Sequence, residues 1–212
     1  MLRLMLFSTL FLSTIKPLEK LEFSYLALGD SYTIGEAVPA NERFPAHLAS
    51  VLNISEPKIV AVTGWTTDEL AAGIQAADIK GTYDLVTLLI GVNNQYRGRS
   101  LEEYREQFTS LLKQAIAFAG NDASHVIVVS IPDWGATPFA EGRDRALIAK
   151  EIDAFNAANK EIALAYKAQW VDITHFTREA AHDPALVAED GLHPSGKDYK
   201  RWATAIAPLV KR

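Results

Sequence analysis

The chain has 212 residues, of which 49% are hydrophobic and 22% charged, and its net charge is −5. This length suits one domain with a full hydrophobic core. The acidic balance gives no electrostatic reason to expect a nucleic acid as partner. The absence of cysteine excludes disulfides, thiolate nucleophiles and thiolate metal ligands.

The first twenty residues differ in character from the rest. Arg3 precedes an apolar run, Leu4–Ile15, and such a pattern is typical of a secretory signal because the run is short for a membrane span. We therefore divide the chain into a candidate signal peptide or apolar segment (1–20) and one domain (21–212). We expect export to the periplasm or medium and no stable membrane span in the mature domain. A cytoplasmic protein with an apolar N-terminal helix is the alternative, since no Ala-x-Ala cleavage signal is present.

Five apolar runs in the remaining chain predict strands. They cover residues 23–28, 58–62, 85–90, 126–131 and 170–173. The third and fourth runs are apolar at nearly every position. Such continuous runs are typical of strands covered on both faces, which favours a parallel sheet.

Helical patterns fill the gaps between these runs. Ser100 and Glu103 predict a capping box, and Gly120 is placed to end the helix that follows. Further helices are predicted within 45–52, 68–76, 143–170 and 195–210. The alternation predicts an α/β protein, a three-layer α/β/α sandwich around a parallel sheet of about five strands.

Chemically useful residues follow the predicted strands. Ser31 follows the first strand, Gly64 the second and Asn93 the third, while Asp190 and His193 precede the last helix. In open parallel sheets, ligands bind beyond the carboxyl ends of the strands. The fold therefore predicts that these segments share one site.

These residue types together suit acyl transfer. A serine hydroxyl becomes a nucleophile when a base takes its proton, and His193 can be that base if Asp190 orients its imidazole. The backbone N–H groups of Ser31 and Gly64 and the side-chain amide of Asn93 can stabilise the oxyanion of a tetrahedral intermediate.

The order of the segments resembles the SGNH/GDSL hydrolase family. The matching motifs are Gly29-Asp30-Ser31, Gly64, Gly91-x-Asn93 and Asp190-x-x-His193. The resemblance implies a flavodoxin-like α/β/α fold, esterase or lipase activity on a small-molecule ester, no metal and no organic cofactor. It also implies a triad of Ser31, Asp190 and His193, with Gly64 and Asn93 completing the oxyanion hole.

One position departs from the family pattern. The third family motif usually reads Gly-x-Asn-Asp, whereas this chain has Asn94 in place of the final aspartate. Because this position is not the oxyanion donor, we expect the change to affect local structure rather than activity.

The Asp-x-x-His pattern occurs three times. Asp122/His125 precedes a strand and falls at the wrong end of the sheet, whereas Asp172/His175 follows a strand and competes with Asp190/His193. We prefer the last pair because it lies in a loop rich in glycine and proline, which Ser195 is expected to fix by capping the next helix.

Other conspicuous residues have structural interpretations. Asp30 reads as a turn residue whose side chain holds backbone amides. Packing or exposure to solvent is expected for Trp65, Trp134, Arg97, Arg99, His47 and His182. The alternative for the two tryptophans is to line an acyl pocket, and the alternative for the two arginines is contact with an anionic group of the substrate.

Two other functions stay open. One is a metal-dependent phosphoesterase using Asp30, Asn93, Asp190 and His193, although asparagine binds hard metals weakly. The other is a non-catalytic binding module on the same fold. A dinucleotide-binding protein is excluded because no Gly-x-Gly-x-x-Gly follows the first strand. The short connecting loops indicate an open cleft and small or flexible substrates.

Overall fold

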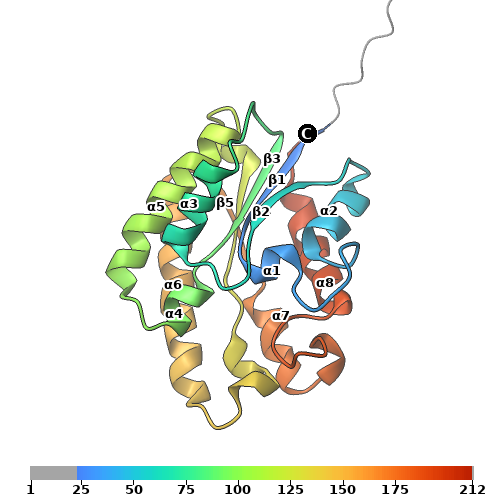
Figure 1. Cartoon of the computed structure of the whole chain (residues 1–212), viewed down its shortest axis with the longest axis vertical. Coiled ribbons are helices and arrows are strands. Elements are labelled where there is room, and N and C mark those ends of the chain that lie inside the picture. The colour runs from blue at the N-terminus through green and yellow to red at the C-terminus, as the bar shows by residue number, and fades with distance from the viewer. Residues whose placement is uncertain (1–22, 212) are drawn as a thin grey trace, which may run out of the picture.

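The computed structural model describes residues 23–211. A parallel five-stranded sheet lies between two layers of helices (Figure 1). The strands are β1 (Tyr25–Gly29), β2 (Lys58–Ala61), β3 (Leu85–Leu89), β4 (Val126–Val129) and β5 (Gln169–Val171). The protein is therefore the three-layer α/β/α sandwich that the sequence predicts.

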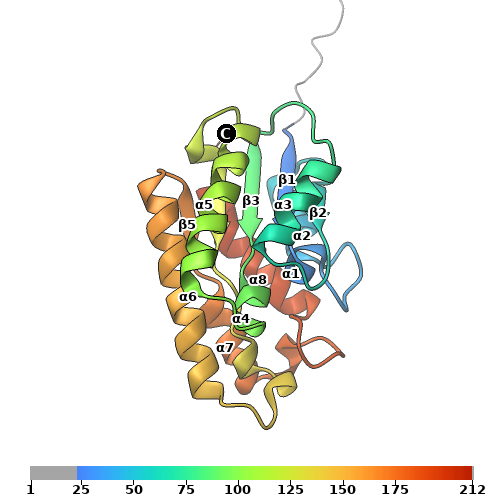
Figure 2. The same ribbon diagram turned by 60° about the vertical axis from the view of Figure 1, so that its left-hand side comes forward.

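Helices cover both faces of the sheet. They are α1 (Ser31–Ile34), α2 (Phe44–Leu52), α3 (Thr67–Ala76), α4 (Val92–Tyr96), α5 (Leu101–Phe118), α6 (Arg145–Ala165), α7 (Thr174–Arg178) and α8 (Gly196–Ile206). Short 3-10 helices are Ala123–His125, Trp134–Ala136, Pro138–Ala140, Glu179–Ala181, Pro184–Leu186 and Ala207–Leu209. Helices α2 and α8 pack together on one face, and α3, α5 and α6 lie on the other (Figures 1 and 2). Within residues 23–211, no helix combines the length and apolar character that crossing a bilayer requires.

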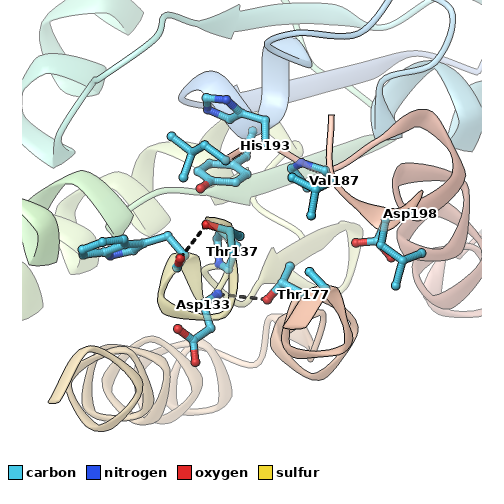
Figure 3. Close-up of a pocket in the computed structure, with 13 residues that line it drawn as sticks. Asp133, Thr137, Thr177, Val187, His193 and Asp198 are labelled. Atoms are coloured by element: carbon cyan, nitrogen blue, oxygen red, sulfur yellow. Dashed lines mark hydrogen bonds between the residues drawn. The ribbon is translucent and has the colours of Figure 1, made fainter. Parts of the chain in front are cut away.

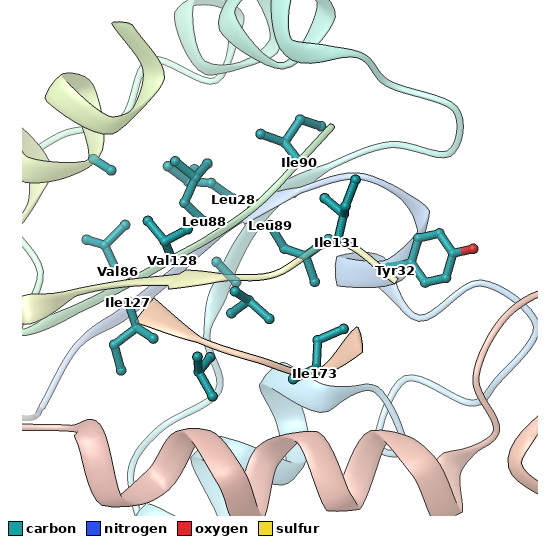
Figure 4. Packing of buried hydrophobic residues seen from close by; sticks show 14 of the residues in the cluster. Leu28, Tyr32, Val86, Leu88, Leu89, Ile90, Ile127, Val128, Ile131 and Ile173 are labelled. Atoms are coloured by element: carbon teal, nitrogen blue, oxygen red, sulfur yellow. The ribbon is translucent and has the colours of Figure 1, made fainter. Parts of the chain in front are cut away.

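Burial in the core explains why the strands of the sheet are formed by continuous apolar runs of sequence. Every residue of β1, β3 and β4 is buried, because helices cover both faces of the sheet. Leu28, Leu88 and Val128 come from these three neighbouring strands and pack in one cluster (Figure 4). On the α2–α8 face, the rings of Phe44 and Trp202 lie 6.0 Å apart and both are buried.

The strand order creates a crevice at one edge of the sheet. The order is β2-β1-β3-β4-β5, so the chain runs outward from β1 to β2 and then returns to β3 on the other side of β1. Connections that leave β1 and β3 in opposite directions open a crevice at their carboxyl ends. Helix α1 follows β1 and α4 follows β3, as the arrowhead of β3 shows in Figure 2.

The observed elements differ from the predicted ones mainly at their ends. The fifth strand is 169–171 rather than 170–173, and the short helices α1, α4 and α7 were not predicted because four or five residues carry no periodicity. The candidate signal segment, 1–20, lies outside the described residues, so its role stays a prediction.

The predicted capping box at the start of α5 forms only in part. The Ser100 hydroxyl accepts the Glu103 N–H at 3.1 Å, but the Glu103 carboxylate binds Arg99 and Gln107 instead of returning to the cap. At the other end, Gly120 follows the helix with φ of +66°, a conformation in which glycine carries no steric penalty.

Candidate active site

The segment Gly29-Asp30-Ser31 joins β1 to α1. A Cβ at Gly29 would lie 2.5 Å from the carbonyl oxygen of Leu89, so this position needs glycine for β1 and β3 to stay in contact. Asp30 caps α1, because its Oδ1 accepts the Tyr32 N–H at 3.0 Å. Ser31 is thereby the first residue of a helix and lies at the crevice.

Ser31, His193 and Asp190 form a continuous hydrogen-bonded chain. The His193 Nε2 lies 2.9 Å from the Ser31 Oγ, and its Nδ1 lies 2.5 Å from Asp190 Oδ2. If Nδ1 carries the ring proton, it donates a hydrogen bond to the carboxylate. Nε2 is then unprotonated and accepts a hydrogen bond from the Ser31 hydroxyl. The His193 side chain is buried, which excludes most water from the pair.

The second oxygen of Asp190 holds the loop. Its Oδ1 accepts the N–H groups of Leu192 at 2.9 Å and His193 at 3.0 Å. Burial alone would raise the pKa of the Asp190 carboxyl, but the hydrogen bonds from the imidazole and from these two N–H groups outweigh it and lower the pKa. The carboxylate is therefore ionised at neutral pH.

The loop before α8 is fastened by backbone hydrogen bonds. The Ala188 N–H donates to the His193 carbonyl at 2.8 Å, and the Phe139 N–H donates to the Gly191 carbonyl at 2.9 Å. Ser195 occupies the N-cap position of α8, as expected, but its side chain makes no capping hydrogen bond. Its hydroxyl donates to the Ala185 carbonyl at 2.7 Å and so ties the loop to the preceding 3-10 helix rather than to α8.

The backbone N–H groups of Ser31 and Gly64 have no acceptor within residues 23–211. Gly64 has φ of +83°, and the Trp65 N–H donates to the Val62 carbonyl at 3.3 Å across it. A positive φ at the third position of such a turn favours glycine. Both N–H groups are thus free to bind an anion.

Asn93 lies in the first turn of α4. Its Nδ2 donates to the Trp65 carbonyl at 3.0 Å and makes a longer contact of 3.5 Å with Asp30 Oδ2. Its second N–H is therefore held weakly and can turn to a stronger acceptor. Gly91 precedes α4 with φ of +129°, and a Cβ there would lie 2.5 Å from the Tyr104 ring.

Asp30 is fully buried beside Ser31. Burial raises the pKa of its carboxyl to about 7, although the hydrogen bond from the Tyr32 N–H opposes this shift. A carboxyl group near Ser31 and Asn93 is thus partly protonated around neutral pH.

A cavity of about 110 Å³ opens directly beside Ser31. Its apolar wall consists of Val92, Tyr96, Trp134, Phe139 and Leu192. Trp134 is buried and its Nε1 donates to Gln95 Oε1 at 2.7 Å, whereas the rings of Tyr96 and Phe139 form the exposed rim. The site therefore combines an apolar cavity with the polar groups of Ser31, Asn93 and His193.

A second cavity lies on another side of His193 (Figure 3). Thr137, Thr177 and Asp198 are among its lining residues, and its volume is about 10 Å³. A single water needs about 10–15 Å³, so this cavity is too small for a substrate group.

The other Asp-x-x-His pairs do not join this site. His175 Nδ1 lies 3.6 Å from Asp172 Oδ2 with both side chains about half exposed, and its ring packs on Phe176. His125 Nε2 lies 4.0 Å from Asp122 Oδ2, before β4. Among the described residues, only His193 of the histidines lines the cavity beside Ser31.

The two arginines after α4 pair with acidic residues of α3. Arg97 Nη1 lies 3.3 Å from Glu69, and Arg99 Nη1 lies 2.7 Å from Asp68. Their charges are therefore balanced within the chain. Of the two tryptophans, Trp134 lines the cavity, whereas the Trp65 ring packs on Gly73, where a Cβ would lie 2.1 Å from it.

Asn94 is matched to its neighbours. Its Oδ1 accepts the Thr67 N–H at 3.1 Å, its Nδ2 donates to Thr67 Oγ1 at 2.7 Å, and the Thr67 hydroxyl donates to Gln107. An aspartate cannot donate, so it would turn the hydroxyl away from Gln107. The local network thus suits asparagine.

No group of three or more histidine, aspartate or glutamate side chains in residues 23–211 is arranged to hold a metal ion. Figure 3 likewise shows Asp133 and Asp198 pointing apart around the smaller cavity.

The five-stranded α/β/α sandwich, with its polar segments at the carboxyl ends of the strands, defines an SGNH-type fold. The sequence model of the GDSL-like lipase/acylhydrolase family matches residues 27–201. The chain belongs to this family, and at the level of the family it is an ester hydrolase. No curated protein matches the chain significantly.

Several solved structures share this fold. TesA is 19% identical with a TM-score of 0.67, and the match covers 89% of this chain and 98% of TesA. Axe2, an acetylxylan esterase from Geobacillus stearothermophilus, is 21% identical with a TM-score of 0.68 over 90% of this chain and 94% of its own. A lipolytic G-D-S-L protein from Veillonella parvula DSM 2008 is 18% identical with a TM-score of 0.66, over 89% of this chain and 98% of its own.

Proposed function

We propose that the protein hydrolyses carboxylic esters through an acyl-enzyme intermediate on Ser31. The observation that carries this proposal is the hydrogen-bonded chain from Asp190 through His193 to the Ser31 hydroxyl, with distances of 2.5 and 2.9 Å. A buried imidazole with an ionised carboxylate on one nitrogen and a serine O–H on the other suits proton transfer from that serine.

The proposed reaction has two halves. In the first, the Ser31 oxygen attacks the ester carbonyl while His193 Nε2 takes the hydroxyl proton, and the tetrahedral intermediate collapses when the imidazolium gives this proton to the departing alcohol. In the second, His193 takes a proton from water, the hydroxide attacks acyl-Ser31, and the carboxylic acid leaves as the serine regains its proton. Asp190 stabilises the imidazolium throughout and is not itself protonated.

The negative charge on the carbonyl oxygen needs donors aimed at it. The N–H groups of Ser31 and Gly64 have no other acceptor among the described residues, and Asn93 has one weakly held N–H. We assign these three as the oxyanion hole. Removal of one such donor typically costs about 3–4 kcal/mol in the catalytic step.

The cavity beside Ser31 suits the acyl group of a small ester. Its volume is about 110 Å³, well above the roughly 10–15 Å³ that a single water needs. The alcohol must leave to solvent, whereas the acyl group stays bonded to Ser31, so a partly enclosed apolar cavity fits the acyl part. One solved neighbour is described as an acetylxylan esterase, and an acetyl group would fit this cavity.

Substitution of the nucleophile is the first test. Ser31→Ala should lower the kcat for p-nitrophenyl acetate by at least about 10⁴-fold, since the loss of a triad serine removes covalent catalysis. A fluorophosphonate probe should label the wild type and not the variant. Substantial activity in folded Ser31→Ala would refute the acyl-enzyme mechanism.

The repeated Asp-x-x-His pattern supplies a matched control. His193→Ala should remove nearly all activity, whereas His175→Ala, which alters the same pattern in α7, should keep it. The opposite result would move the base to His175. Loss of activity in excess EDTA would favour the metal-dependent phosphoesterase, and retained activity would favour the serine hydrolase. If the folded wild type reacts with neither the ester nor the probe, this result would support a non-catalytic binding module.

A further inference from the structure

The turn that carries Gly64 is held by two side chains, one from α4 and one from the residue that follows it. Arg97, which directly follows α4, donates from Nη2 to the Gly64 carbonyl at 2.6 Å. Asn93, in the first turn of α4, donates to the next carbonyl, that of Trp65, at 3.0 Å. Two successive peptide groups of the turn are therefore bound to the segment that carries a proposed oxyanion donor.

The turn has weak support of its own. Its backbone hydrogen bond, from the Trp65 N–H to the Val62 carbonyl, is 3.3 Å long. Gly64 has no Cβ to restrict its torsions, so its peptide groups rotate easily when nothing holds them. A hydrogen bond from a charged guanidinium is shorter and stronger than one between neutral groups, which makes the Arg97 contact the tighter restraint.

Glu69 holds the guanidinium in place. Both of its carboxylate oxygens lie 3.3 Å from Arg97 Nη1, and its Oε2 also accepts the Thr66 N–H at 2.8 Å. Thr66 is the residue before α3, at the end of the same turn. The arginine is thus tied to the turn at Gly64 and, through Glu69, at Thr66.

We propose that Arg97 is a positioning residue of the oxyanion hole, which orients the peptide groups at Gly64 so that the Gly64 N–H faces the reacting carbonyl. This inference rests on the proposed function, in which that N–H is an oxyanion donor. Arg97 acts through Gly64 and does not touch the substrate.

The chain offers a matched control in Arg99. This residue lies two positions further along and also pairs with an acid of α3, Asp68, but its contacts are with carboxylates and not with the turn carbonyl. Comparing Arg97→Ala with Arg99→Ala therefore separates loss of the Gly64 contact from loss of a surface ion pair.

The experiment measures kcat and KM for p-nitrophenyl acetate, with melting temperatures recorded by circular dichroism. Arg97→Ala should lower kcat by about tenfold or more and leave KM within about twofold, because oxyanion contacts strengthen in the transition state. Arg99→Ala should change kcat by less than about twofold. Arg97→Lys keeps one charged donor and should recover part of the lost kcat.

Three outcomes decide the matter. Equal losses in the two alanine variants, or no loss in Arg97→Ala, overturn the positioning role while wild-type hydrolysis keeps the proposed function intact. If Arg97→Ala is unfolded, Arg97→Lys decides: a native melting temperature with kcat clearly below that of Arg99→Ala and little change in KM supports the role, and kcat equal to that of Arg99→Ala overturns it. A folded wild type without Ser31-dependent hydrolysis overturns the proposed function and this inference together.

Discussion

Asp30 illustrates how one residue can serve the fold at a cost in stability. Its carboxylate caps α1 by accepting the Tyr32 N–H. This hydrogen bond orients the first turn of the helix, where Ser31 lies. The same carboxyl is fully buried, and burial raises its pKa to about 7. A buried carboxylate is expensive unless it is well hydrogen-bonded, and the contact with Asn93 is long at 3.5 Å.

This conflict predicts a pH-dependent stability. An unfolded aspartate titrates near pH 3.9, so between about pH 4 and pH 7 the folded protein keeps a proton that the unfolded chain has released. Rising pH therefore lowers the free energy of unfolding across this interval, by about 1.4 kcal/mol for each unit of pKa difference. Asp30→Asn cannot ionise but can still cap α1.

Urea unfolding of both proteins across the interval tests this prediction. The wild type should lose stability relative to Asp30→Asn as the pH rises, by a few kcal/mol in total, with little further change above about pH 7. If the difference in free energy of unfolding between the two proteins does not vary with pH, Asp30 is ionised in the folded protein across the whole interval.

At the scale of elements, the loop before α8 determines where the imidazole lies. Gly191 has φ of +71°, a conformation that other residues adopt only with strain. Its carbonyl accepts the Phe139 N–H at 2.9 Å, which links the loop to the segment that lines the cavity. Both the backbone conformation and this link position His193 relative to Ser31.

Gly191→Ala should therefore reduce activity beyond its effect on stability. The added Cβ would lie 3.6 Å from Pro138, an ordinary contact, so the penalty is backbone strain of about 1–3 kcal/mol. We expect several-fold lower kcat with p-nitrophenyl acetate and a modestly lower melting temperature.

Gly81 provides the matched control. It has φ of +75° with open space around its Cβ position, and it lies before β3, at the opposite end of the sheet from Ser31. Gly81→Ala should lower the melting temperature comparably and leave kcat unchanged. Equal kcat in the two variants would mean that the Gly191 loop tolerates the strain without moving His193.

At the scale of the whole molecule, the strand order decides what the substrate meets. Because the strand order reverses between β1 and β3, Ser31 and α4 face one crevice. The segment after β4 supplies Trp134 and Phe139 as its wall. The rings of Trp134 and Phe139 lie 6.0 Å apart, with Tyr96 within 6.1 Å of both. The cavity of about 110 Å³ is thus bounded by aromatic rings.

This boundary predicts a preference for short acyl chains. In a series of p-nitrophenyl esters, acetate and butyrate should give higher kcat/KM than decanoate, and Phe139→Ala should move the optimum toward longer chains because it opens the rim. Leu164→Ala removes an exposed side chain of α6 that does not line the cavity and should leave the profile unchanged. A wild-type optimum at decanoate would contradict the assignment of the cavity to the acyl group.

The sequence by itself determined the layers of this protein and the segments in which its chemistry lies. The runs at 85–90 and 126–131 predicted buried parallel strands because a strand covered on both faces must be apolar at every position, and β3 and β4 lie there. The family motifs could be read because they keep their order along the chain, three of them after β1, β2 and β3 and the fourth in the loop before α8.

Only the tertiary structure decided which distant residues touch. The contact of Arg97 with Gly64 spans 33 positions, and that of Trp134 with Gln95 spans 39. Such pairs have no periodicity or local spacing to reveal them, because they depend on how the sheet order brings loops together. The hydrogen bond of the Ser195 hydroxyl to Ala185 and the volume of the cavity could not be predicted from the sequence for the same reason. Both depend on packing between segments rather than on the neighbouring residues in the chain.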